Sequence, residues 1–279
     1  MNTVNRIDVK KIIYTVILGM AGLMFMMPFI WMLSASFKPE GDVFNYPIEW
    51  IPRHWNAIEN YREVWFGKAN FLRYYWNSIK ISGLTTLFSC IVSSLAAFGF
   101  SKIDFRGRNT VFFMVLALYM IPHEATLVPL FILYRELNLY DTHTGLILMG
   151  SFSVLGTFML RQFFMGVHNE YIESAQLDGA GFFKIFMRIA LPLCKPAVIT
   201  YAILRFIWTW NDYQGPLIFL RSSSQYTVQL GISQFADAHG EFYSLIMAGS
   251  VSAILPLLIV FILGQKQIIE GISLGGVKG

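Results

Sequence analysis

Charged residues and cysteines are scarce in this sequence. Only 14% of its 279 residues are Asp, Glu, Lys or Arg, whereas 55% are hydrophobic. This composition excludes a soluble globular domain and indicates a polytopic membrane protein. The two cysteines, Cys90 and Cys194, lie in an apolar run and in a central loop. Their number and spacing predict neither a disulfide framework nor a metal site.

Signatures of nucleotide binding and catalysis are also missing. The sequence has no Gly-x-x-x-x-Gly-Lys-Ser/Thr segment, so this chain does not cradle nucleotide phosphates by that device. It has no nucleophile elbow, no zinc-ligand cluster and no Cys–His arrangement, and it lacks the internal repeat that marks many ion-coupled carriers. We therefore expect a chain that is not an enzyme and that binds no metal or cofactor of its own.

Six apolar segments are long enough to cross a bilayer as helices, which takes about 20 residues. A cleaved signal peptide, with Ser34, Ala35 and Ser36 as its cleavage site, is the alternative for the first segment, but the apolar run is longer than such peptides have. The predicted fold is all-α, a single transmembrane domain over residues 1–279. Its spans are expected at 12–33, 79–100, 111–133, 144–165, 197–220 and 244–263.

The loops between these segments differ in charge, which predicts the orientation of the chain. The short loop 101–108 carries Lys102, Arg106 and Arg108, and the loop 166–196 is also basic; positive loops face the cytoplasm. Both tails, 1–11 and 265–279, are then cytoplasmic. The loop 37–76, with mixed charges and several tryptophans, is external and near the headgroups. This pattern predicts a multi-pass protein of a bacterial-type plasma (inner) membrane.

Two of the spans carry polar residues that a membrane tolerates only where they face protein or water. Glu124 lies between two prolines in 111–133, and we interpret that span either as a bent helix lining a pathway or as one whose polar residues reach water at the outer interface. In 197–220, Arg205, Trp208 or Thr209, Asp212 and Pro216 share one helical face. The candidate pathway residues are Glu124, Trp208, Trp210, Asn211, Asp212 and Tyr213.

These residue types suit a carbohydrate. Asn and Asp hydrogen-bond hydroxyl groups, Trp covers the apolar face of a sugar ring, and an interrupted helix at mid-membrane is typical of a transporter site. The alternative is an internal ion pair between Arg205 and Asp212 that only stabilises packing.

The central loop is polar and patterned. A short helix with Asn169 as its N-cap is expected to stop at Asp178 and Gly179 through a left-handed turn. A second, amphipathic helix follows, with Phe182, Ile185, Phe186 and Ile189 on one stripe, and it ends or bends at Pro192 and Pro196. The small residues around the turn allow another protein surface to come close.

This stretch resembles the Glu-Ala-Ala loop of the membrane subunits of ABC importers. Ser174 replaces the first alanine of the family pattern, and the matching residues are Glu173, Ala175, Asp178, Gly179, Ala180, Ile189, Leu191 and Pro192. The resemblance implies that the loop is cytoplasmic and docks as a coupling helix into a groove of a separate ATP-hydrolysing subunit. An ordinary amphipathic loop between spans is the alternative.

Three further segments resemble the carbohydrate branch of that family, the maltose-type second permease. They are 60–65, 210–217 and the glycine-rich end 271–279. The resemblance implies a sister permease in a heterodimer, a dimer of ATPase subunits that uses the ATP, and an external solute-binding protein that delivers a sugar or oligosaccharide. An importer of a non-sugar solute, an ion-coupled carrier with Glu124 or Asp212 as a proton site, and a membrane scaffold or sensor are the alternatives.

Overall fold

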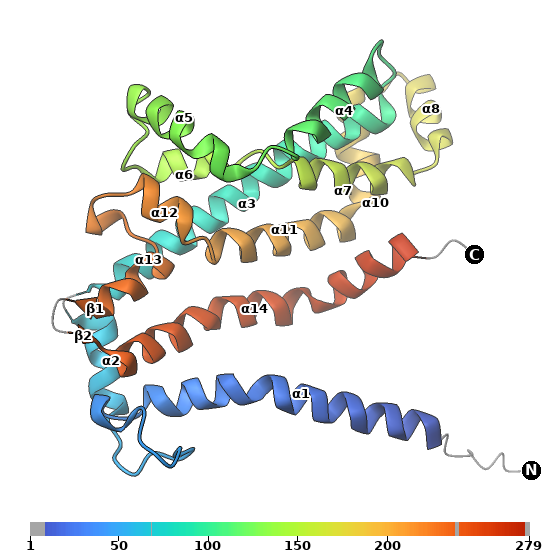
Figure 1. Cartoon of the computed structure of the whole chain (residues 1–279). Coiled ribbons are helices and arrows are strands. Elements are labelled where there is room, and N and C mark those ends of the chain that lie inside the picture. Colours follow the sequence, from blue (N-terminus) through green and yellow to red (C-terminus); the bar gives the residue numbers. More distant parts are fainter. Residues whose placement is uncertain (1–8, 68, 238–239, 277–279) are drawn as a thin grey trace, which may run out of the picture. The chain divides into compact units, whose positions relative to one another are not determined.

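The computed structural model describes residues 9–67, 69–237 and 240–276 (Figure 1). The chain forms two compact units. The smaller unit comprises Met1–Asn70 and Ile232–Ser252, and the larger unit comprises Phe71–Gly231 and Ala253–Gly279.

Almost all regular structure is helical. The smaller unit contains α1 (Val9–Ser36), η1 (Glu40–Asp42), α2 (Ala57–Phe66), η4 (Ser233–Phe235) and a ribbon of two short strands, β1 (Ala236–Asp237) and β2 (Gly240–Glu241). The larger unit contains α3 (Phe71–Lys102), α4 (Arg108–Leu118), α5 (His123–Glu136), α6 (His143–Gly150), α7 (Val154–Met165), α8 (Asn169–Leu177), α9 (Phe182–Ile185), η2 (Phe186–Ala190), α10 (Leu191–Leu193), α11 (Lys195–Trp210), α12 (Gln214–Phe219) and η3 (Ser223–Gln225). Two helices contribute to both units, α13 (Val228–Ile232) and α14 (Tyr243–Gly276).

Three helices of the described residues are long and apolar enough to cross a membrane: Lys10–Ser36, Phe71–Lys102 and Tyr243–Gln267. A fourth span results if α6 and α7, which meet at a bend of 42°, are counted as one. The two remaining predicted spans are each divided, 111–133 between α4 and α5 and 197–220 between α11 and α12. The prolines in 111–133 and the polar run in 197–220 predict these two breaks, so the interrupted helices are confirmed.

The break between α6 and α7 was not predicted, and local hydrogen bonds explain it. Ser151 Oγ donates to Ile147 O (2.6 Å), which returns the side chain to its own helix. Ser153 Oγ accepts a hydrogen bond from Gly156 N (3.0 Å) and so caps the start of α7. The second span begins earlier than predicted. It was expected at 79–100, but α3 begins at Phe71, inside the segment 37–76 that was expected to be a loop.

The end of α1 argues against the signal-peptide alternative. Ser34, Ala35 and Ser36 form its last turn and are buried, whereas a cleavage site must be accessible and extended. In the smaller unit, the chain that follows returns along the helix, because Phe44 packs on Trp31 with ring centroids 5.9 Å apart.

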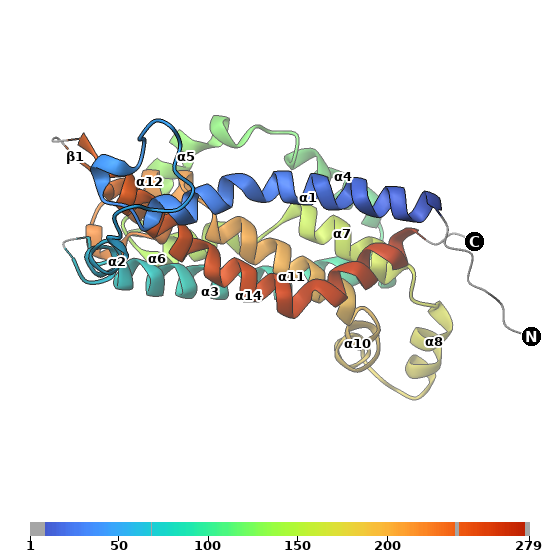
Figure 2. The ribbon, with the colours of Figure 1, turned by 90° about the horizontal axis from the view of Figure 1, so that it is seen from below.

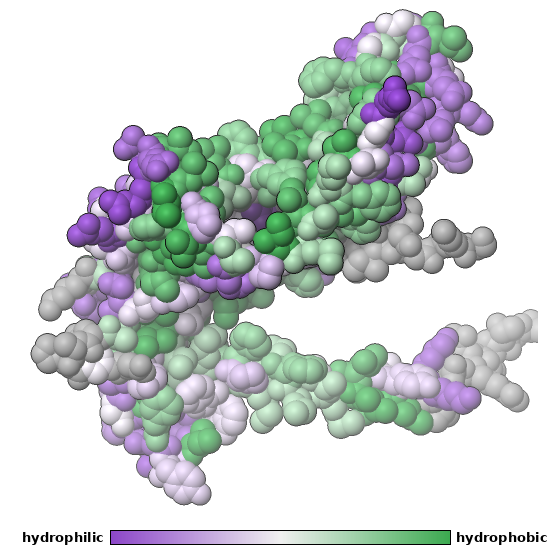
Figure 3. All heavy atoms as spheres, turned by 45° about the horizontal axis from the view of Figure 1, so that its top comes forward, coloured by the Kyte–Doolittle hydropathy of each residue, from purple (hydrophilic) through white to green (hydrophobic). Residues whose placement is uncertain are grey.

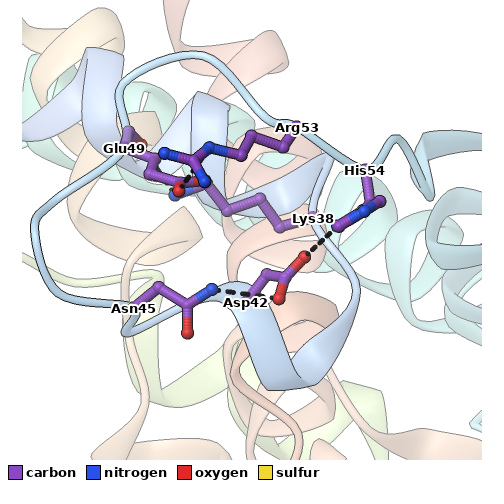
Figure 4. Close-up of polar contacts among 6 residues, drawn as sticks. All are labelled: Lys38, Asp42, Asn45, Glu49, Arg53 and His54. Carbon is purple, nitrogen blue, oxygen red and sulfur yellow. Dashed lines mark hydrogen bonds and ion pairs between the residues drawn. The ribbon is translucent and has the colours of Figure 1, made fainter.

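Polar side chains order the loop that follows α1 (Figure 4). Lys38 is 1% exposed and donates to Glu49 O (2.7 Å). Asp42 accepts from Asn45 (3.0 Å) and contacts His54 Nδ1 at 2.9 Å. The hydrogen bond to His54, opposed by partial desolvation and aided by Asn45, lowers the pKa of the Asp42 carboxyl. These contacts connect distant parts of a loop in which only η1 is helical.

The larger unit is built around α3, which packs along α7 and α11 (Figures 1 and 2). One buried cluster joins these helices to the central loop, since it includes Phe98 of α3, Leu160 of α7, Ile172 of α8 and Tyr201 of α11. Tyr201 OH lies 2.6 Å from Ser89 Oγ. This pair of buried hydroxyls ties α11 to α3 at the middle of the unit.

The surface of the larger unit changes character along its length. Figure 3 shows hydrophilic side chains gathered over its two ends, around α8 and around α5 and α12, with mostly hydrophobic side chains between them. A band of this kind is what lipid-facing surface requires, because side chains beside hydrocarbon are apolar and those beside headgroups and water are polar.

Candidate functional site

A cavity in the larger unit has a volume of about 880 Å³. Its lining comes from helices far apart in the sequence, chiefly α3, α6, α7 and α11. All three helix breaks contribute to it, Tyr119 and Pro122 from the first, Phe152 and Ser153 from the second and Asp212 from the third. Interrupted helices around a central site are typical of membrane transporters.

All five residues of the face predicted for 197–220, Arg205, Trp208, Thr209, Asp212 and Pro216, line the cavity. The single helical face is confirmed only for the first three, which share one side of α11. Asp212 lies in the break after α11, and Pro216 lies on α12.

The alternative of an ion pair between Arg205 and Asp212 is wrong for this structure. Arg205 Nη2 donates to Gly150 O (2.5 Å), and Asp212 Oδ1 accepts from Gly215 N (3.0 Å). Within the described residues, the ion pairs join other side chains. Both charged groups therefore remain available to the cavity that they line.

The other predicted pathway residues lie elsewhere. Trp210 is 1% exposed and donates from Nε1 to Ala253 O (2.9 Å), so it packs α11 against α14. Asn211 donates to Ile207 O and accepts from Gln229. Tyr213 and Glu124 are exposed, and neither lines the cavity. Glu124 lies in the first turn of α5, beside the lining residues Pro122 and Thr126.

Several cavity residues were missed by the sequence analysis. Ser78, Ser82 and Thr85 line the cavity from α3, at a spacing of four and three residues that places them on one face. A hydroxyl stripe within an apolar span was the signal that could have found them. Thr227 joins them because Asn77 Nδ2 donates to Tyr226 O (2.9 Å) and Ser78 Oγ accepts from Val228 N (2.8 Å).

The central loop contains α8, which is anchored on one side and exposed on the other. Ile172 is buried in the cluster of the larger unit, and Ala175, Ala180 and Leu191 pack partly against it. Glu173, Ser174, Asp178, Gly179 and Pro192 are exposed, and Ile189 is half-buried. The residues of the family pattern therefore divide into a buried set that fixes α8 and an exposed set that another protein can contact.

The predicted turn after α8 is confirmed. Gly179 has φ +77°, the left-handed region that favours glycine, and Ala180 N donates back to Ala175 O (2.9 Å). The amphipathic stripe is confirmed only in part, because Ile185 and Phe186 are buried but Phe182 is 43% exposed. The second half of the stripe lies in the π-helical segment η2, which ends at Ala190.

Asn169 is not the N-cap of α8 as predicted. His168 occupies that position, without a side-chain cap, while Asn169 Oδ1 accepts from Lys102 Nζ (2.7 Å). A cation at the end of α3 thus takes up the oxygen that was expected to cap the helix.

Residues 89–271 match the family described as the binding-protein-dependent transport system inner membrane component. The chain belongs to this family. It is an inner-membrane transporter subunit that works with a solute-binding protein, not an enzyme. This result confirms the resemblance of the central loop and decides against an ion-coupled carrier and against a scaffold.

The relatives found by sequence are similar over almost their whole length. The chain is 35% identical over 273 residues to the arabinooligosaccharides transport system permease protein AraQ of Bacillus subtilis (strain 168), covering 98% of this chain and 97% of that protein. It is 31% identical to the galactooligosaccharides transport system permease protein GanQ of the same organism, over 94% of each chain. It is 30% identical to the lactose transport system permease protein LacG of Rhizobium radiobacter, over 100% of each.

The fold also matches a solved structure. A chain of a bacterial ABC transporter involved in the import of the acidic polysaccharide alginate superposes with a TM-score of 0.81, at 24% identity, over 95% of this chain and 99% of that one. The predicted all-α permease fold is therefore confirmed.

Proposed function

We propose that this chain is a permease subunit of an ABC importer for an oligosaccharide. It forms half of the translocation pathway together with a sister permease, and it couples that pathway to a dimer of separate ATPase subunits. ATP is used by those partners, and this chain binds no cofactor. An external solute-binding protein delivers the sugar.

The observation that carries the proposal is the two-sided character of α8. Its buried residue Ile172 belongs to the same cluster as Tyr201 of α11, one turn from Arg205, which lines the cavity. Glu173 of α8 and Asp178, which directly follows the helix, are exposed and can contact another chain. A movement imposed on the exposed side is therefore passed through packed side chains to a helix of the pathway.

Three relatives with oligosaccharide or disaccharide transport in their names support a sugar as the solute. The cavity supports it independently, since it combines hydroxyl and charged side chains with Tyr119, Phe152 and Trp208.

The proposed topology follows from the contact between α8 and the ATPase. Since ATP is hydrolysed in the cytoplasm, the loop 166–196 is cytoplasmic. The tails 1–11 and 265–279 are then cytoplasmic as well, and 37–76 lies outside. The side chains of 268–279 are outside the described residues, so the role of the glycine-rich end stays a prediction.

Uptake of radiolabelled sugars into vesicles tests the function. The vesicles contain this chain with its sister permease, its ATPase and its binding protein, and a panel of mono- and oligosaccharides is supplied with ATP. We expect ATP-dependent uptake of at least one oligosaccharide. Uptake that persists without the ATPase, or uptake of an amino acid or phosphate instead, contradicts the proposal.

Glu173→Lys tests the docking surface, because it reverses a charge on the exposed side of α8. We expect it to abolish both uptake and co-purification of the ATPase while the chain still inserts. Gly179→Asp should act similarly, by straining the left-handed turn. Glu136→Lys is the matched control, since Glu136 is exposed at the end of α5, far along the unit from α8 (Figure 1).

A further inference from the structure

The cavity contains buried polar atoms that the protein itself does not satisfy. Within the described residues, Ser82 Oγ, Thr85 Oγ1, Thr209 Oγ1, Thr227 Oγ1 and Arg205 Nε are buried and have no hydrogen-bond partner. All five residues line the cavity. Ser82, Thr85 and Thr227 are 1%, 0% and 4% exposed. Buried polar groups are normally paired because an unpaired one is costly. Five of the ten unpaired atoms among the described residues are gathered around this one cavity, where a ligand could pair them.

Four of these five residues lie on two helices that pack together, and we call them the hydroxyl wall. Ser82 and Thr85 lie on α3, and Arg205 and Thr209 lie on α11, which packs along it. The hydrogen bond between Ser89 and Tyr201 closes the wall at one end. From Thr85 to Ser78 the lining face of α3 extends over seven residues, roughly 10 Å at the helical rise. That length exceeds a single sugar ring.

The cavity also has aromatic side chains in its lining. Tyr119, Phe152 and Trp208 are 65%, 47% and 43% exposed, so their rings have surface that other atoms of this chain do not cover. All three line the cavity. Sugar rings have apolar faces and hydroxyl edges, so a cavity with aromatic side chains and a separate wall of donors and acceptors suits them.

The charges of the lining select against a charged ligand. The charged lining residues are Arg205 and Asp212, one of each sign. An ionised ligand would bring a net charge into a cavity that has no excess of the opposite charge, which is unfavourable in a membrane protein. A neutral hydroxyl group can instead accept from the guanidinium and donate to the carboxylate.

We infer that this subunit itself holds a binding site for a neutral oligosaccharide of at least two sugar units, formed by the hydroxyl wall of α3 and α11 and by Trp208. The inference rests on the proposed function and adds to it the location of the site and the class of sugar. The inferred ligand is neutral, whereas the transporter that shares this fold is involved in the import of an acidic polysaccharide.

Binding to the solubilised permease–ATPase complex, without the external binding protein, tests the site. The probes are radiolabelled neutral mono-, di- and trisaccharides. We expect the di- or trisaccharide to bind more tightly than its monosaccharide unit. We expect uronate oligosaccharides to compete at least tenfold less well than neutral ones of the same length. Equal or better competition by the uronates overturns the inference.

Two small substitutions locate the site. Thr85→Val and Ser82→Ala each remove one unpaired hydroxyl with little change of shape, and the loss of one hydrogen bond to the sugar predicts a three- to tenfold rise in Kd. Thr86→Val is the matched control, because the Thr86 hydroxyl is also buried and unpaired but the residue does not line the cavity. An equal effect of Thr85→Val and Thr86→Val, or no effect of either wall variant, overturns the inference.

The two proposals fail in different ways. If wild-type vesicles take up an oligosaccharide and Glu173→Lys abolishes uptake, the proposed function stands whatever the wall variants do. If the wall variants leave sugar binding unchanged in that case, the site lies in another subunit and only the further inference is wrong. Absence of ATP-driven sugar uptake by the wild type overturns both.

Discussion

Lys102 Nζ lies 2.7 Å from Asn169 Oδ1, which joins the last residue of α3 to the first residue of α8. The same ammonium group donates to Val167 O, just beyond the end of α7. Arg161 of α7 makes the converse contact, from Nε to Phe100 O in the last turn of α3 (3.1 Å). Each cation lies near the negative end of the other helix, which is favourable. The pair α3–α7 therefore forms one body that holds α8 at one end and lines the cavity at the other.

Lys102→Met tests this link, because it removes the charge and keeps most of the side-chain volume. Hydrogen bonds to charged groups contribute about 1.5–3 kcal/mol, so α8 should lose its position although the core stays packed. We expect sugar uptake to fall severalfold while ATP hydrolysis continues, and Lys102→Arg to restore part of the uptake. Lys184→Met, an exposed lysine of the same loop, is the control. Equal uptake by the Lys102→Met and Lys184→Met variants contradicts the link.

Gly156→Ala should destabilise the larger unit. A β-carbon at Gly156 would collide with the ring of Tyr201, which is 1% exposed and bonded to Ser89, so the ring cannot easily move. Overpacking of this kind costs about 1–3 kcal/mol. Thermal unfolding in detergent measures the effect. Gly83→Ala is the control, because a β-carbon there meets nothing within 4 Å; equal midpoints for the two variants would show that the ring adapts.

The sequence was sufficient for the features that depend on local pattern. The left-handed turn at Gly179 is confirmed. The apolar runs are confirmed for three long helices, or four if α6 and α7 count as one span. Arg205 and Asp212 line one cavity, although the helix ends between them. Features that depend on packing between distant segments were not accessible. Trp210 has the composition of a sugar contact but is buried against Ala253, and Asn169 has the composition of an N-cap but accepts from Lys102. In both cases a partner more than 40 residues away decides the role.

The contact between the loop before α6 and the loop after α12 should lose stability in acid through Asp141. Partial burial raises the pKa of this carboxyl, but hydrogen bonds from Ser222 and from the backbone of Arg221 outweigh it and hold the pKa below its usual value. A depressed pKa in the folded state means that the stabilisation is present above the unfolded value, about 3.9, and is lost as the pH falls through the folded value.

Asp141→Asn isolates this contribution, because Asn also tolerates the left-handed backbone at this position (φ +58°). We expect a lower unfolding midpoint than the wild type at pH 7, and a difference that shrinks as the pH falls below the unfolded value of about 3.9 and is lost once the pH is below the folded value. Asp104→Asn is the comparison, since Asp104 is 98% exposed and its ion pair with Arg108 contributes little. A difference between wild type and Asp141→Asn that is constant from pH 7 to pH 3 contradicts the assignment.

Glu40 should control the start of the last helix. Its two carboxylate oxygens accept from Tyr243 N (2.9 Å) and Ser244 N (2.8 Å), so it pairs two amides of the first turn of α14 and adds a negative charge at the positive end of the helix. Loss of such a cap costs about 0.5–2 kcal/mol. Glu40→Ala should therefore speed hydrogen exchange at Tyr243 and Ser244 by roughly three- to thirtyfold, at 1.4 kcal/mol per factor of ten.

Glu40→Gln should give an intermediate rate, because the amide keeps one acceptor and loses the charge. Glu59→Ala, an exposed glutamate of α2, should leave the exchange unchanged. If Glu40→Ala and Glu59→Ala exchange alike at these two amides, α14 starts independently of the loop that follows α1. If only Glu40→Ala accelerates exchange, the segment after α1 determines where the last membrane helix begins, although the two are about 200 residues apart in the sequence.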